Sequence, residues 1–147
     1  MKAKEWLERG KIENDPPNKL GDLWRGFNHL FFPEKGGPET QKLKGFLSNN
    51  VSEASATEIL AAHPGAVDYL VGEPVVDMRG NGRDTQPRID EFHNADDHLS
   101  KLVALFLIIY QVRCNLEHGQ KSPNRARDMQ LCANASCVLQ DVLERCT

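Results

Sequence analysis

The sequence predicts an all-α protein, an up-and-down helical bundle whose two long C-terminal helices are antiparallel. Three observations predict this fold class. Apolar residues recur at steps of three and four in several segments, which is the period of an amphipathic helix. Proline and glycine separate these segments, and almost no stretch alternates apolar and polar residues as a half-buried strand does. A chain of 147 residues suits a single domain, residues 1–147.

The N-terminal part begins with an extension over residues 1–17, in which a short helix over 3–9 ends at Gly10. Asp15-Pro16-Pro17 then begins a helix over 18–32, because proline is tolerated in a first turn. Pro33 ends this helix. Its apolar residues follow helical spacing and are expected to face the core: Leu20, Leu23, Trp24, Phe27, Leu30 and Phe31.

Three shorter helices are predicted next. The first covers 39–47 and turns Leu43, Phe46 and Leu47 inward. The second follows Ser52, a residue type that caps helix N-termini, and continues to Ala62. A short helix over 64–71 completes this half of the chain.

Residues 72–88 contain Gly80, Gly82 and two prolines, so we expect a mobile loop there. The chain becomes helical again at Ile89. The strongest helix is predicted over 95–118, and its apolar run 102–110 marks it as the central helix of the bundle.

A turn at 119–121 leads to the last helix, which begins at Ser122-Pro123 and ends near Arg145. Its apolar and small residues recur at helical spacing and are expected to be buried: Met129, Cys132, Ser136, Leu139 and either Val142 or Leu143.

The composition is that of a soluble globular protein, with 39% hydrophobic and 27% charged residues. The net charge of −3 argues against a protein that coats nucleic acid through bulk charge. We expect a cytoplasmic protein, because no apolar run is long enough to span a bilayer and the N-terminus is charged. The four cysteines form no CxxC pair, so they are expected to be small, mostly buried hydrophobes and not disulfides or zinc ligands.

Arg113 and His118 at the end of the apolar helix are the first candidates for chemistry. An imidazole can take and give a proton near neutral pH, and a guanidinium matches phosphate oxygens. Together they suit metal-independent phosphodiester cleavage. The two residues are five steps apart, about 140° around an ideal helix, and share a face only if the helix ends between them. Asn115, three residues before His118, could orient the imidazole.

A simpler interpretation competes with this one. Arg113 could pair with Glu117 four residues later, leaving His118 as an ordinary residue of a helix C-terminus.

The apolar helix ending in Tyr110-Gln111-Val112-Arg113-Cys114-Asn115-Leu116-Glu117-His118-Gly119, followed by Lys121-Ser122 and another helix, resembles the HEPN superfamily. The signature of that superfamily is Arg, four to six residues, then His. Leu23-Trp24-Arg25-Gly26-Phe27-Asn28 resembles the N-terminal helix of its Apea-like branch. The resemblance covers residues 18–145.

This resemblance implies an α-helical homodimer that brings two Arg–His pairs into one cleft. It implies a metal-independent endoribonuclease of a toxin–antitoxin, antiphage or stress-response system. Such an enzyme would need no cofactor, and its partner would be RNA or a cognate antitoxin. Arg113 would hold the phosphate and His118 would shuttle protons. The alternative is a catalytically inactive HEPN module that binds nucleotide, RNA or a partner protein. An Arg113 closed off by Glu117 would favour the binding module.

Two further groups of residues remain candidates. Basic residues of the loop and of the segment after the motif could contact RNA: Arg79, Arg83, Arg88, Lys121, Arg125 and Arg127. Scattered surface charge is the alternative for them. A metal-dependent hydrolase at Asp90, His93 and Asp97 is ranked last, because a solvated polar face explains that spacing as well.

Overall fold

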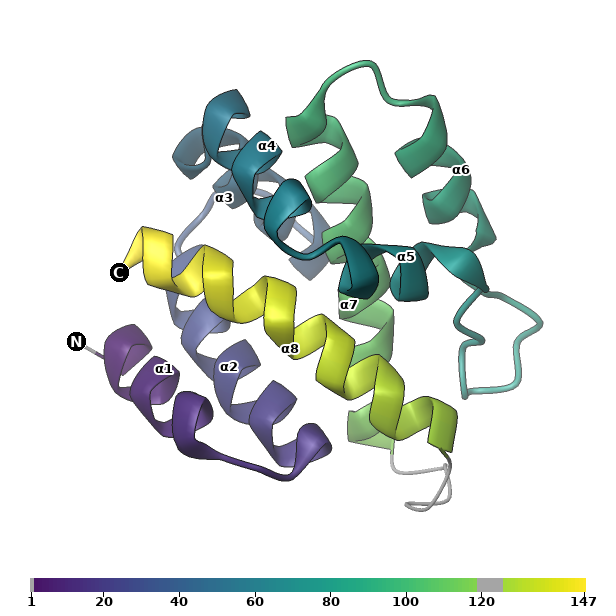
Figure 1. The fold of residues 1–147 in the computed structure, drawn as a ribbon, viewed down its shortest axis with the longest axis horizontal. Coiled ribbons are helices and arrows are strands. Elements are labelled where there is room, and N and C mark those ends of the chain that lie inside the picture. Colours follow the sequence, from purple (N-terminus) through teal and green to yellow (C-terminus); the bar gives the residue numbers. More distant parts are fainter. Residues whose placement is uncertain (1, 119–125) are drawn as a thin grey trace.

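The computed structural model describes residues 2–118 and 126–147 and confirms an all-α helical bundle (Figure 1). Across those residues no β-strand forms, and a single antiparallel bridge joins Val76 and Asp84. Eight helices are present within the described ranges: α1 Lys2–Ile12, α2 Pro16–Phe31, α3 Glu39–Asn50, α4 Glu53–Ala62, α5 Pro64–Gly72, α6 Gln86–Asn94, α7 His98–His118 and α8 Ala126–Cys146.

Helix α7 is the central element, and α8 crosses it obliquely while packing mainly against α2 and α5 (Figure 1). The apolar run of α7 is buried against its neighbours, as the sequence predicted, except for the half-buried Val103 and Tyr110. By length and composition alone α7 could also cross a membrane, but 50% of its most apolar window is buried inside the protein. Burial of half the window is compatible with a core helix, and a cytoplasmic location stays a prediction.

The N-terminal segment is part of the bundle and not an extension beside it. Helix α1 continues past Gly10, where the sequence predicted its end, and buries Ala3, Leu7 and Gly10 against α2. A Cβ atom at Gly10 would lie 2.7 Å from Leu23 Cδ2, so the glycine permits the close approach of the two helices.

We predict opposite effects for two glycine-to-alanine substitutions in α2. A Cβ at Gly26 would lie 3.0 Å from the carbonyl oxygen of Ala3, so α1 must shift, and Gly26→Ala should destabilise by about 1–3 kcal/mol. At Gly21 the nearest atom is Arg25 Nη1 at 3.8 Å, so Gly21→Ala should stabilise by about 0.5–1 kcal/mol. Urea unfolding measures both. Equal effects at the two positions would contradict the close packing of α1 on α2.

Helix ends match the sequence at several places. The Asp15 carboxylate accepts the Asn18 amide at 3.1 Å, and Ser52 Oγ accepts the Ser55 amide at 3.0 Å. The predicted inward residues of α2 and α3 are buried except for Leu30, which is half-buried. In α8 the predicted residues are buried except for Met129, which is half-buried. The predicted start of that helix at Ser122-Pro123 lies outside the described residues.

The predicted helix over 95–118 begins later, at His98, and residues 95–97 separate it from α6. A local cap and a contact from another helix stabilise this start, and the cap is the Asp97 carboxylate, which accepts the Ser100 amide at 3.0 Å. The Glu53 carboxylate of α4 accepts the backbone amides of His98 and Leu99, both at 2.9 Å. These backbone hydrogen bonds lower the pKa of Glu53.

The loop predicted over 72–88 is shorter and more regular than expected, because Gly72 ends α5 and residues 86–88 belong to α6. The backbone amide of Thr85 donates to the Val75 carbonyl at 3.1 Å, and that of Asp77 donates to the Arg83 carbonyl at 2.9 Å. These bonds pair the two arms of a hairpin-like turn, with Gly80 and Gly82 at positive φ in its tip.

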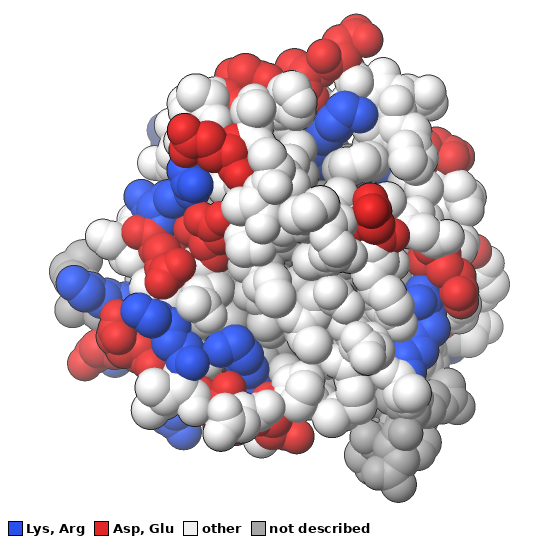
Figure 2. Space-filling view, viewed as in Figure 1, with Lys and Arg blue, Asp and Glu red and all other residues white. Residues whose placement is uncertain are grey.

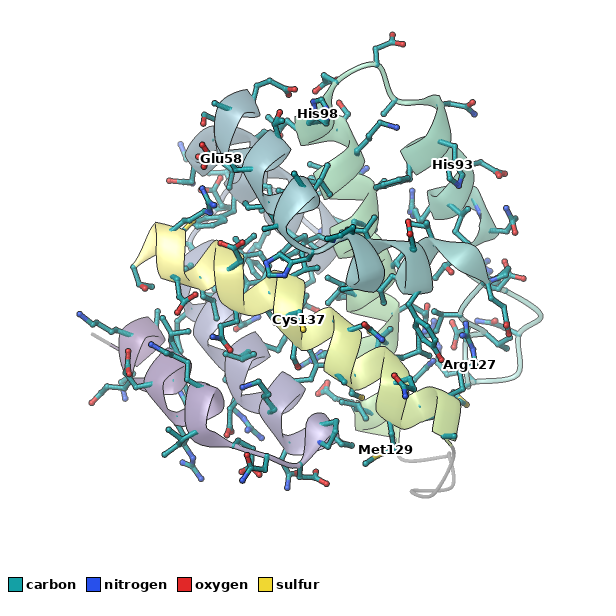
Figure 3. All side chains as sticks on the ribbon, in the orientation of Figure 1. Glu58, His93, His98, Arg127, Met129 and Cys137 are labelled. Atoms are coloured by element: carbon teal, nitrogen blue, oxygen red, sulfur yellow. The ribbon has the colours of Figure 1, made fainter. Side chains whose placement is uncertain are left out.

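All four cysteines are free, as predicted. Cys132 is buried, Cys114 and Cys146 are half-buried, and Cys137 is exposed on α8, in contrast to the predicted burial (Figure 3).

Candidate functional site

Arg113 lies in the wall of a pocket at the C-terminal end of α7. Its side chain is 24% exposed, and its guanidinium carbon lies 5.8 Å from the centre of the Trp24 ring. Arg113 Nη1 and Glu117 Oε2 are 2.8 Å apart, so the simpler pairing that the sequence allowed is present. Glu117 is more exposed than Arg113 and also lines the pocket.

The pocket has a volume of about 740 Å³, which is within the range of ligand-binding pockets. It is formed by α1, the N-terminal half of α2, the last turns of α7 and the first turn of α8, which meet at the lower end of the view in Figure 1. Met129, labelled in Figure 3, marks its α8 side.

The pocket contains charged side chains of both signs. Three arginines and four carboxylates line it: Arg9, Arg25, Arg113, Glu13, Asp22, Glu117 and Asp128. Asp22 is buried and pairs with Arg25 at 3.2 Å and with Arg9 at 3.8 Å, so these two arginines are partly neutralised. The pocket therefore suits a ligand that carries a single anionic group together with hydrogen-bond donors.

Two buried polar atoms at this pocket make no hydrogen bond in the described part of the chain. They are the indole nitrogen Nε1 of Trp24 and the carboxylate oxygen Oδ2 of Asp128. Both residues line the pocket. A buried polar atom without a partner is costly, but both atoms lie behind the pocket surface, where a ligand reaches them only if neighbouring groups move.

His118 is the last residue of α7 and is exposed. Helix α7 is unbroken from Arg113 to His118, so the two side chains leave the helix about 140° apart. Within one copy of the chain the helix backbone does not direct both motif side chains at one phosphate. The helix reaches His118 as predicted, so the condition under which the two residues would share a face is not met.

Asn115 is buried and connects α7 to the preceding loop. Its Nδ2 donates to the Val76 carbonyl at 2.9 Å, and its Oδ1 accepts the Met78 amide at 3.0 Å. Oδ1 also accepts Gln111 Nε2 at 2.9 Å. These contacts give Asn115 a role that the sequence did not reveal, which is to hold the loop on α7. Its orientation of His118 stays a prediction.

Three of the four predicted RNA-binding residues that the structure describes are paired with carboxylates. Arg79 Nη2 lies 2.7 Å from Asp77 Oδ2, Arg88 Nη1 lies 3.0 Å from Glu91 Oε2, and Arg127 Nε lies 3.4 Å from Glu73 Oε2. Arg83 is exposed, and its side chain has no ion pair in the described residues. Lys121 and Arg125 lie outside the described residues. Figure 2 likewise shows acidic and basic side chains interleaved at the rim of a largely uncharged face over α8.

The Asp77 carboxylate is the anchor of the loop. It is 3% exposed and accepts hydrogen bonds from the Arg79 amide, the Arg79 guanidinium and Asn81 Nδ2. The Arg79 guanidinium holds the pKa of Asp77 well below its usual range, and Asp77 raises the pKa of Arg79.

Cys114, which follows Arg113, is not an activated thiol. Burial raises its pKa. Burial also raises the pKa of the neighbouring Tyr110, whose hydroxyl donates to Glu39 Oε1 at 3.1 Å. A nucleophilic cysteine needs a lowered pKa, so Cys114 does not have the environment of one.

The metal interpretation fails on geometry. The helical spacing of Asp90, His93 and Asp97 is broken because α6 ends at Asn94, and Asp97 accepts the Ser100 amide at 3.0 Å. No group of three or more potential metal ligands gathers anywhere in residues 2–118 and 126–147. In Figure 3 His93 also lies well away from Met129, which lines the pocket.

The sequence did not identify Trp24 and Asp128 as site residues. Trp24 was assigned to the core, where its ring does lie, and Asp128 comes fifteen residues after Arg113 in the chain, on another helix. Only the packing of α2, α7 and α8 brings them to one pocket.

Comparisons with known proteins give no match to a family model, to a curated protein or to a solved structure. The HEPN resemblance is therefore carried by the residues quoted above alone.

Proposed function

We propose that this chain is a HEPN-like binding module that holds one nucleoside monophosphate unit, free or as part of an RNA strand, in the pocket at the end of α7. One observation carries the proposal: Arg113 faces a pocket of about 740 Å³ that also has aromatic and polar walls. A guanidinium binds phosphate oxygens through paired, charge-assisted hydrogen bonds.

The ion pair with Glu117 is a weak obstacle to such a ligand. Both side chains are partly exposed, and exposed ion pairs four residues apart on a helix contribute about 0.3–0.5 kcal/mol. A phosphate hydrogen-bonded to Arg113 contributes about 1.5–3 kcal/mol by comparison. The phosphate can therefore displace Glu117.

The charges of the pocket limit the ligand to one phosphate. Three arginines face four carboxylates there, so a triphosphate would meet more repulsion than attraction. We expect monophosphates to bind more tightly than the corresponding triphosphates.

The test is calorimetric titration of the full chain with a nucleoside monophosphate and with a short single-stranded RNA. Arg113→Gln should weaken binding of the monophosphate at least tenfold, because it removes a charged hydrogen-bond donor. Glu117→Gln should strengthen it about twofold, the value of the ion pair that it removes. Arg88→Gln is the matched control, since Arg88 is paired on α6 away from the pocket, and it should change nothing.

The outcomes show whether the ligand is a free nucleotide or part of an RNA strand. RNA that binds far more tightly than the monophosphate, with the same dependence on Arg113, would identify an RNA strand as the ligand. Similar affinities would identify the free nucleotide. Absence of binding by the unmodified chain, or an Arg113→Gln variant that binds normally, would refute the proposal.

A second candidate is the metal-independent endoribonuclease, favoured by the exposed position of His118 beside the pocket residue Glu117. The 140° separation requires that a second copy bring its own Arg113 or His118 to the same phosphate, so this activity belongs to a homodimer. His118 would act as acid and base, and the 2′-hydroxyl would attack the adjacent phosphate to leave a cyclic phosphate and a 5′-hydroxyl.

The ribonuclease predicts RNA cleavage in excess chelator by a dimeric protein, and loss of at least 100-fold in rate in His118→Ala. His29→Ala, an exposed histidine on α2, is the control and should cleave normally. Cleavage that is unchanged in His118→Ala would remove His118 from the mechanism, and an inactive unmodified protein would leave only the binding module.

A further inference from the structure

The hairpin-like turn over residues 75–85, between α5 and α6 in Figure 1, carries the one Asn-Gly pair of the sequence, Asn81-Gly82. We propose that Asn81 is a site of spontaneous deamidation, and that the negative charge formed there loosens the turn from the central helix α7. This inference does not depend on the proposed nucleotide binding. It rests on the exposure of Asn81, on the backbone of Gly82 and on the contact between Asn81 and the buried Asp77.

The reaction needs only the chain and water. The backbone nitrogen of Gly82 attacks the side-chain carbonyl carbon Cγ of Asn81. An N–Cγ bond forms, the Cγ–Nδ2 bond breaks, and Nδ2 leaves as ammonia with the proton of the Gly82 amide. Water then opens the cyclic imide at either of its two carbonyl carbons. The products are an aspartyl and an isoaspartyl residue, each with a carboxylate in place of the side-chain amide.

The tip of the turn leaves the attacking nitrogen unobstructed. Asn81 and Gly82 are exposed, and a Cβ atom at Gly82 would meet nothing within 4 Å beyond its two chain neighbours. Gly82 has a φ of +77° and no side chain that could shield its own nitrogen. The Arg83 amide donates to Asn81 Oδ1 at 2.9 Å, and a donor on this oxygen stabilises the charge that develops there during the attack.

Deamidation places the new charge beside a carboxylate that is already buried. Asn81 Nδ2 donates to Asp77 Oδ2 at 3.1 Å, and Asp77 is 3% exposed. The Arg79 guanidinium holds the pKa of Asp77 well below its usual range, so Asp77 is negatively charged at neutral pH. The reaction therefore replaces a hydrogen-bond donor with a second carboxylate, and like charges repel strongly where water is largely excluded.

Asp77 lies between the two backbone contacts that hold the turn on α7. The Val76 carbonyl accepts Asn115 Nδ2 at 2.9 Å, and the Met78 amide donates to Asn115 Oδ1 at 3.0 Å. The amide of Asp77 itself donates to the Arg83 carbonyl at 2.9 Å. A displacement of Asp77 is therefore transmitted to both arms of the turn and to its contact with α7.

Arg79 offers a competing outcome. Its side chain is 56% exposed and already pairs with Asp77, so it could turn toward the new carboxylate and neutralise it. The turn would then keep its contacts after deamidation. Hydrogen exchange of the backbone amides in the turn separates the two outcomes, because it reports how often their hydrogen bonds open.

The first experiment follows the unmodified full chain by peptide mass mapping during incubation at mildly alkaline pH. Asn81 should deamidate at least about tenfold faster than Asn94, an exposed asparagine whose successor Ala95 has a side chain beside the attacking nitrogen. Two products of equal mass, the aspartyl and isoaspartyl peptides, should appear. Asn81→Gln should block the reaction, since glutamine would have to form a larger ring. A reaction at Asn81 no faster than at Asn94, or a single aspartyl product, would overturn the assignment of the site.

The second experiment measures the consequence with Asn81→Asp, which carries the charge of one product. The amides of Asp77 and Met78 should exchange at least about fivefold faster than in the unmodified chain. Asn94→Asp is the matched control, because it adds the same charge at the end of α6, and it should leave both rates unchanged. Unchanged exchange in Asn81→Asp would mean that Arg79 neutralises the new charge, and would overturn the proposed loosening.

Discussion

Phe27→Ala is expected to destabilise the protein by about 3–5 kcal/mol, the cost of deleting a large aromatic side chain from a packed core. Phe27 is fully buried in α2. Its ring lies 5.1–5.8 Å, centre to centre, from four aromatic rings, those of Trp24, Phe31, Phe46 and Phe106. These rings come from α2, α3 and α7, so the cavity would open where three helices meet.

Urea unfolding followed by circular dichroism measures this loss. Phe32→Ala is the matched control in the adjoining turn, because Phe32 is 63% exposed and its only described ring contact is the Lys42 ammonium at 4.4 Å. It should cost less than about 1 kcal/mol. A loss below about 1.5 kcal/mol for Phe27→Ala would mean that the surrounding helices close the cavity, against the packing described here.

Asp77→Asn is expected to destabilise the protein by about 2 kcal/mol at pH 7. It removes the negative charge of a carboxylate that accepts hydrogen bonds from the Arg79 amide, the Arg79 guanidinium and the Asn81 side chain. The folded-state pKa of Asp77 is lowered, so its contribution is complete above the unfolded value of about 3.9 and decreases as the pH falls toward the folded value. The difference between the two proteins should therefore shrink below about pH 4.

Unfolding free energies of both proteins, measured from pH 7 to pH 3, test whether the difference between them shrinks on acidification. Glu91→Gln serves as the control, since Glu91 is exposed and pairs with Arg88 on the surface, and its effect should be below about 0.5 kcal/mol. A difference between Asp77→Asn and the unmodified protein that grows on acidification would contradict the assignment of Asp77 as a charged anchor.

The helices could be predicted because their signals are local. Asp15, Ser52 and the prolines lie next to the ends that they determine, and the spacing of Leu20, Leu23 and Phe27 gives the buried face of α2 directly. The start of α7 carries one local signal, since Asp97 accepts the Ser100 amide, and one signal that the sequence does not show, the carboxylate of Glu53, 45 residues earlier. Gly10 was read as a helix end for the same reason: its partner Leu23 is on another helix.

In the candidate site, too, some residues could be identified from local sequence signals and others could not. Arg113 was identified from its conflict with an apolar helix, and its pairing with Glu117 follows from a spacing of four residues. Asp128 and Trp24 gave no such signal, because a carboxylate in a first helical turn and an aromatic on an apolar face have ordinary explanations. Their place in the pocket wall depends on the meeting of α2, α7 and α8, which local periodicity does not encode.

The side-chain amide of Asn115, one turn before His118, hydrogen-bonds to the backbone of Val76 and Met78. It thereby joins two segments that are almost forty residues apart in the chain. Removing that amide would release the hairpin tip, and with it Arg79, from the end of the central helix. If Asn115→Ala weakens the proposed nucleotide binding, comparison with Asp77→Asn, which also releases the loop, shows whether the loss comes from the lost contact between loop and helix.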